Sequence, residues 1–154
     1  MSDATNTTTT QVLDLDGLAD DFLTVARMTV MDPRSGEPSP MWIDYAGPGH
    51  PQYDAEEDRI IRRALRERVA LDKARVTGGR SFKVADDETD PAAFMERNIA
   101  SHVNRIVDWG GASIPFTKEA AKKFFRTPPG RLIMQQGEDF MATERRFTKT
   151  SAKN

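Results

Sequence analysis

The side chains best suited to metal binding in this chain are its two histidines, His50 and His102, because the sequence contains no cysteine. No short ligand spacing links them. His50 stands among prolines and glycines and is interpreted as a loop residue. His102 lies next to the apolar stripe of an expected helix and is interpreted as a boundary residue. No G-x-S-x-G motif marks a serine nucleophile. We therefore assign no metal-binding or nucleophilic residue.

Acidic side chains are close together at Asp86, Asp87, Glu88 and Asp90. A hydrolytic carboxylate pair needs apolar surroundings that raise the pKa of one acid, and this segment is polar, so we interpret the acids as solvated. Gly78-Gly79-Arg80-Ser81 lacks the lysine and the strand-to-helix context of a phosphate loop. We expect no catalytic residue, no cofactor and no small-molecule substrate. An enzyme with a carboxylate-based site is an alternative that convergent, buried acids in a pocket would support.

The net charge is only −2, but the charges are distributed unevenly along the chain. Residues 1–58 carry twelve acids and two bases (−10), residues 59–116 eleven bases and eight acids (+3), and residues 117–154 nine bases and four acids (+5). This asymmetry fits an acidic surface that meets a basic one, within the fold or on a neighbouring copy. It equally fits solvated faces that differ in sign.

Basic side chains suggest nucleic-acid binding as a further alternative, carried by residues 59–75 and the C-terminal segment. Glu67 and Asp72 interrupt the first group, which is interpreted as a solvated helix face. The phenylalanines of the second group lie at helical spacings that suit core packing better than base stacking. A continuous basic face formed by both segments would favour this alternative.

Length and composition fit one α+β domain at residues 12–147, since 154 residues suffice for a single core. No apolar run is long enough to span a bilayer. Residues 1–11 are small and polar and predict a flexible N-terminal arm. A small antiparallel hairpin or sheet is expected at residues 22–45, because two runs of β-forming side chains flank the turn-favouring Asp32-Pro33-Arg34-Ser35-Gly36.

About four helices are expected after the sheet, at residues 54–76, 91–108, 118–126 and 129–147. In the first helix, Asp54 and Glu57 have the spacing of a capping box. Its apolar residues trace one helical stripe: Ile60, Ile61, Ala64, Leu65, Val69 and Leu71. Asp90 and Thr117 are placed to cap the second and third helices. Residues 148–154 are expected to form a flexible tail.

Two segments of the chain combine aromatic residues with turn residues. The first runs from Asp32-Pro33-Arg34-Ser35-Gly36-Glu37-Pro38 to Trp42-Ile43-Asp44-Tyr45-Ala46-Gly47-Pro48. In the second, Val107-Asp108-Trp109-Gly110-Gly111 precedes Ile114-Pro115-Phe116-Thr117-Lys118-Glu119-Ala120-Ala121. Together they resemble small tail-module proteins of bacteriophages that infect proteobacteria, which carry a W-x-G … P-F-(S/T)-x-E-x-A segment. The resemblance covers about residues 22–147. The chain departs from it in the short connection 109–116 and in the double proline Pro128-Pro129.

Proteins of this kind are identified as tail assembly chaperones, which coat the tape measure protein while the tail tube polymerises, or as virion structural proteins. The resemblance implies a non-catalytic protein that contacts other phage structural proteins, copies of itself and, if it is a chaperone, the tape measure protein. It implies location in the virion or the host cytoplasm, and no membrane partner. A small accessory protein of the head or head–tail junction that contacts nucleic acid is an alternative.

The second of these segments also has a purely structural interpretation. Trp109 is expected to end the second helix at a glycine turn, and Phe116 to re-enter the core before the helix that Thr117 caps. The predicted structural corner consists of Trp109, Gly110, Gly111, Pro115, Phe116 and Thr117. This interpretation needs no ligand, so the motif indicates a fold more than a binding site.

Overall fold

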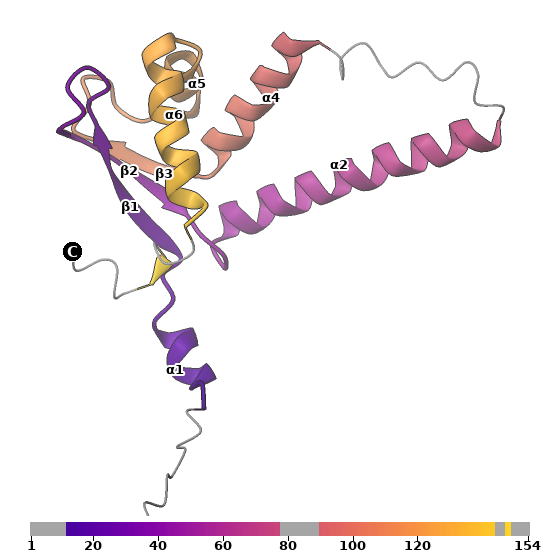
Figure 1. The fold of residues 1–154 in the computed structure, drawn as a ribbon, viewed down its shortest axis with the longest axis horizontal. Helices are drawn as coiled ribbons and strands as arrows, with labels where there is room; N and C mark the ends of the chain where they lie inside the picture. Colours follow the sequence, from indigo (N-terminus) through magenta and orange to yellow (C-terminus); the bar gives the residue numbers. More distant parts are fainter. Residues whose placement is uncertain (1–11, 78–89, 144–146, 149–154) are drawn as a thin grey trace, which may run out of the picture.

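The computed structural model describes residues 12–77, 90–143 and 147–148. They form a three-stranded antiparallel sheet and five helices, which confirms the expected α+β class. Figure 1 shows that α4, α5 and α6 gather beside the sheet, whereas α1 and α2 project away from it. The expected arm at residues 1–11 and most of the expected tail lie outside the described residues.

The predicted hairpin is present as β1 (Val25–Met31) and β2 (Pro38–Ala46), paired with Ala26 opposite Tyr45 and Met28 opposite Ile43. The Asp32 amide donates to the Glu37 carbonyl at 2.8 Å, and Gly36 takes a positive φ of 72° that favours glycine. Side chains of β1 alternate between buried and exposed, so only one face of the sheet is covered.

The expectation of a helix at residues 91–108 is wrong at its C-terminal end. Helix α4 (Pro91–Asn104) stops early, and β3 (Ile106–Gly110) pairs with the far side of β2, with Trp109 opposite Ile43. Ile106 follows Val103 at a helical spacing, but Ile-Val-Asp-Trp is equally rich in β-formers. Pairing with β2, which is distant in sequence, supplies the backbone hydrogen bonds that decide between the two.

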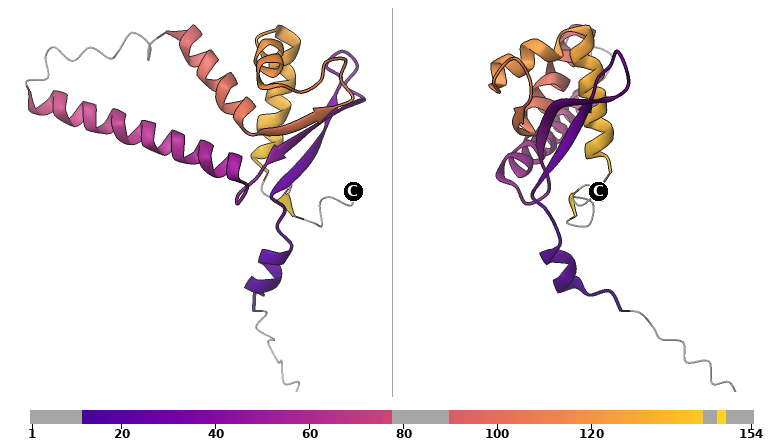
Figure 2. Two further views of the ribbon diagram at one scale, coloured as in Figure 1. Left: turned by 180° about the vertical axis from the view of Figure 1, so that it is seen from behind. Right: turned by 90° about the vertical axis from the view of Figure 1, so that its left-hand side faces the viewer.

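Helix α2 (Pro51–Val76) begins before the predicted start, and His50, not Asp54, is its N-cap. His50 Nδ1 accepts a hydrogen bond from the Gln52 amide at 3.2 Å, and Pro51 occupies the first turn, where its missing N–H costs nothing. Figure 2 shows that this long helix leaves the domain at its base and runs outward.

The last two helices are α5 (Lys118–Phe125) and α6 (Pro128–Met141). Helix α6 is shorter than the expected 129–147, and Phe147 instead lies beyond it with 4% of its surface exposed. A Cβ at residue 47 would collide with the Phe147 ring, so the absence of a side chain at Gly47 allows this ring to pack directly against the backbone there. Thr148, expected to begin the free tail, forms an antiparallel bridge with Phe22.

The core lies between the covered face of the sheet and helices α4, α5 and α6. It includes Met28, Val30, Ile43, Tyr45, Ile99, Val103, Ile106, Trp109, Phe125 and Ile133, each at most 6% exposed. The C-terminal phenylalanines belong to it: Phe125 and Phe147 are buried, and Phe124 and Phe140 pack against it. This confirms that they serve packing.

Candidate interaction site

The predicted structural corner is assembled around Trp109, although Trp109 lies on β3 and not at a helix end. Its side chain is 6% exposed, its indole N–H donates to the Ile114 carbonyl at 2.8 Å, and the Phe116 ring meets it edge-on at 5.3 Å between centroids. Gly111 has a φ of 67°, and a Cβ there would collide with the Pro40 carbonyl. Trp109 is therefore a core residue, and Phe116 packs against the core.

The remaining corner residues have simpler roles. Thr117 caps α5, because its hydroxyl accepts a hydrogen bond from the Ala120 amide at 3.0 Å. A Cβ at Gly110 would collide with the Trp42 ring on the neighbouring strand. Pro115 is exposed. None of these residues belongs to the lining of the pocket beside Glu138 that is described below.

His102 is not the boundary residue that the sequence indicated: it is 1% exposed and lies at the centre of a polar chain within the core. Its Nε2 is 2.9 Å from the Tyr45 hydroxyl, and its Nδ1 is 2.7 Å from a Glu138 carboxylate oxygen. A carboxylate only accepts, so Nδ1 carries the proton, and Nε2 then accepts from Tyr45. Both ring nitrogens are thus occupied.

The two partners of His102 differ in their exposure and in the direction of their pKa shifts. Burial raises the pKa of the Tyr45 hydroxyl, which therefore stays protonated as a donor. The hydrogen bond from His102 lowers the pKa of the Glu138 carboxyl. The Glu138 side chain is 49% exposed while that of His102 is fully buried, so Glu138 alone connects this chain of hydrogen bonds to the surface.

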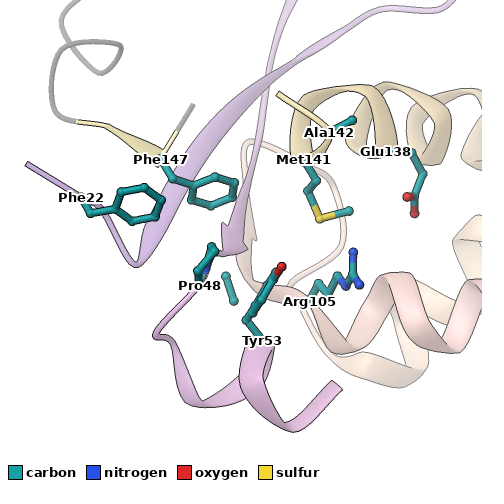
Figure 3. A pocket seen from close by; sticks show the side chains of 9 residues that line it. Phe22, Pro48, Tyr53, Arg105, Glu138, Met141, Ala142 and Phe147 are labelled. Carbon is teal, nitrogen blue, oxygen red and sulfur yellow. The ribbon is translucent and has the colours of Figure 1, made fainter. Parts of the chain in front are cut away.

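A pocket of about 490 Å³ opens beside Glu138. Figure 3 shows Phe22 and Phe147 on one side of it and Arg105 and Glu138 on the other. Among the described residues, the lining consists of Phe22, Ala46, Pro48, Tyr53, Arg105, Glu138, Met141, Ala142 and Phe147. Most of this wall is apolar, as is typical of sites that accept a hydrophobic group.

Arg105 gives the pocket its cationic side. Its Nη2 donates to Glu57 at 2.8 Å, and its guanidinium lies 5.6 Å from the centre of the Tyr53 ring. Its Nε is buried and has no hydrogen-bond partner among the described residues. Because Nε is buried, a group in the pocket meets the positive charge of the guanidinium and not this atom. The pocket suits an apolar side chain next to a carbonyl or carboxylate oxygen.

Glu56 fixes the base of α2 to α4. This carboxylate is 2% exposed and accepts hydrogen bonds from Arg59 at 2.6 Å, Ser101 at 2.6 Å and Asn104 at 2.9 Å. Burial raises the pKa of Glu56, but the three donors together outweigh it and leave the pKa below its ordinary value. Only the spacing of Glu56 and Arg59 signals part of this cluster in the sequence.

Beyond Glu56, the expected apolar stripe of α2 is not part of the core. Ile61, Leu65 and Val69 are 53%, 56% and 52% exposed, and the other large members of the stripe, Ile60 and Leu71, are also exposed. Periodicity identified a helix correctly, but it does not show what covers the stripe. Most of the bases beside it are exposed too, and Arg63 is half-buried. Exposed apolar rows of this kind mark contact surfaces.

Helix α1 (Leu15–Asp20) also has no buried residue. Asp14 caps it by accepting a hydrogen bond from the Gly17 amide at 3.1 Å. Leu13, Leu15 and Leu18 are 67%, 69% and 46% exposed. The chain thus presents apolar side chains on two projecting helices in addition to its pocket.

The residues first considered for chemistry take structural roles or lie outside the described residues. His50 and Asp90 are helix N-caps, and Asp90 accepts from the Ala92 amide at 3.0 Å. Residues 78–81 and 86–88 are outside the described part. No cluster of metal-ligating side chains occurs within residues 12–77, 90–143 and 147–148.

The helices of this described part include none that is both long and apolar enough to cross a membrane.

Three parts of the described structure expose apolar side chains, and we call them the contact features: the pocket, the α2 row and the α1 segment. Comparison with protein-family models, curated proteins and solved structures found no match to this chain.

Proposed function

We propose that this chain is a non-catalytic bacteriophage protein of tail morphogenesis that acts through protein–protein contacts, as an assembly chaperone or as a minor virion subunit. The observation that carries the proposal is the exposed row Ile61, Leu65 and Val69 on a helix that leaves the domain. Leaving three large aliphatic side chains in water forgoes their burial energy unless a partner covers them. The resemblance of the two aromatic and turn segments supplies the phage context.

The pocket supports the same proposal. Its apolar wall and the positively charged Arg105 guanidinium suit a protruding side chain of another protein together with a backbone or carboxylate oxygen. Among the described residues that line it, Glu138 is the one carboxylate, so they lend no support to a carboxylate pair. Four of the nine bases in residues 117–154 lie outside the described residues, so the continuous basic face that a nucleic-acid role would need stays a prediction.

The test is an infection in which the chain carries an affinity tag and its partners are cross-linked and identified by mass spectrometry. We expect tail proteins, the tape measure protein among them if the chain is a chaperone. The variant Leu65→Ser/Val69→Ser is expected to lose these partners and to reduce the yield of tailed particles, with its melting temperature unchanged because both side chains are exposed. Leu132→Ser, an exposed position on α6, is the matched control.

Mass spectrometry of purified virions separates the two forms of the proposal. A permanent subunit is present in mature particles, and a chaperone is absent from them. Normal yield and normal tails with the α2 variant would contradict the proposal, as would capture of enzymes or nucleic acid in place of tail proteins.

A further inference from the structure

We infer that α1 of one copy docks on the exposed face of α2 of a second copy, so that the chain associates with itself head to tail. The inference deepens the proposed function, because it names a second copy as one of its partners. Three observations carry it: the two surfaces are both apolar, they are opposite in charge, and α1 does not reach this part of its own α2.

The α2 surface combines an apolar row with positive charge. Ile61, Leu65 and Val69 are spaced by four residues and therefore form one ridge along the helix. Residues 59–76 contain seven bases and two acids, a charge of +5. Most of the bases, including Arg62 and Arg66 next to the row, form no ion pair with another described residue.

The α1 surface is its complement. Leu15 and Leu18 are spaced by three residues on α1 and therefore lie on one face of the helix, and both are exposed. Residues 12–22 contain four acids and no base, a charge of −4. Among these acids, Asp21 follows Leu18 by three residues and so lies beside the apolar line. Docking would bury aliphatic side chains on both partners and bring opposite charges together.

The position of α1 prevents the same contact within one chain. The Leu23 amide donates to the Phe147 carbonyl at 2.6 Å and Phe22 bridges to Thr148, so the C-terminal end of α1 is held at the domain. From Asp20 back to Leu15, α1 extends only about 8 Å. Leu65 lies fourteen residues into α2, about 21 Å from its first residue. Figure 1 shows the two helices diverging from the domain.

A contact between two different surfaces does not close on itself. Each copy would offer one α1 and one α2, so the product is an open chain or a ring, not a symmetric pair. Because the contact is small and charged, the association is expected to weaken as salt rises.

The experiment is sedimentation velocity of the purified full-length chain over a range of concentrations. We expect species larger than the 17.2 kDa monomer as the concentration rises, and fewer of them when salt is raised from about 0.05 M to about 0.5 M. Two variants block one surface each: Leu15→Ser/Leu18→Ser on α1, and Leu65→Ser/Val69→Ser on α2. Circular dichroism and melting temperature establish that both remain folded.

Each variant alone should remain a monomer. An equimolar mixture should form a one-to-one complex, twice 17.2 kDa, and nothing larger, because only one productive contact is left. Charge reversal gives an independent version: Asp16→Lys/Asp21→Lys and Arg62→Glu/Arg66→Glu should each abolish association, and mixing them should restore it.

The inference is overturned if the wild-type chain is a monomer at every concentration, or if the mixed variants form no complex. It is also overturned if the α1 variant still dimerises, because α2 would then pair with α2, or if the α2 variant does, because α1 would pair with α1. Head-to-tail association without any tail phenotype in infection would reject the proposed function and leave this inference standing.

Discussion

Replacing Trp109 with alanine tests whether the corner is part of the core or a contact surface. The indole is 6% exposed, packs edge-on against Phe116 and donates to the Ile114 carbonyl. Truncating a buried tryptophan to alanine costs roughly 3–5 kcal/mol. For a chain of this size that corresponds to a fall in melting temperature of roughly 6–20 °C.

A second substitution separates packing from the hydrogen bond. Trp109→Phe keeps an aromatic ring against Phe116 and loses only the indole donor and some volume. Because Ile114 is exposed, its carbonyl can bind water instead, so the expected cost is about 1–2 kcal/mol. Leu132→Ala, at an exposed position, should stay within about 0.5 kcal/mol of the wild type.

The assay is urea unfolding followed by far-ultraviolet circular dichroism, with melting curves measured on the same samples. Phage yield is expected to fall together with stability in Trp109→Ala. An unchanged melting temperature with lost assembly would refute the core assignment and make Trp109 a contact residue.

Three further predictions concern other buried groups. Hydrogen bonds lower the pKa of Glu56, so this carboxylate stabilises the fold at neutral pH and loses that contribution as the pH falls through its folded pKa, below 4.5. Glu56→Gln should therefore reduce the loss of unfolding free energy between neutral and acidic pH. An unchanged dependence of stability on pH would contradict the stabilising role of the Glu56 hydrogen bonds. Gly137→Ala places a methyl group against the Tyr45 hydroxyl and should cost about 1–3 kcal/mol in urea unfolding, whereas no cost would show that α6 shifts freely. His50→Ala should lower the free energy of unfolding by about 1 kcal/mol through the lost helix cap, and His102→Ala should lower it more because two hydrogen bonds are removed. Neither substitution should reduce function by more than its loss of stability explains. Lost function at an unchanged melting temperature would instead support an enzymatic role.

Local signals in the sequence were sufficient for the hairpin and for most helix boundaries. The turn at Asp32 to Gly36 and the caps at Asp90 and Thr117 act over a few residues, so they can be recognised without knowing the rest of the fold. Strand β3 was missed because Ile106 and Trp109 satisfy helical and strand patterns alike, and only the distant β2 decides between them.

The contact features were less accessible to sequence reasoning. The row of α2 was recognised as an apolar stripe, but periodicity records which side chains share a face and not whether anything covers that face. His102 was placed at a boundary because its partners, Tyr45 and Glu138, come from β2 and α6. The pocket likewise joins residues from five separate stretches of the chain, so no local sequence motif could have predicted it.

Because Glu56 helps to hold α2 to the domain near its first residue, the helix is a long rod that is fixed at one end. Its 26 residues extend about 39 Å, and the fastening hydrogen bonds lie within its first turns. A tilt of about 5° at the base would displace the far end by about 3 Å along such a length. Ser101 and Asn104, the two donors that come from α4, therefore help to set the angle of α2 to the domain, and small changes at either residue would be magnified into larger displacements at the far end of the helix.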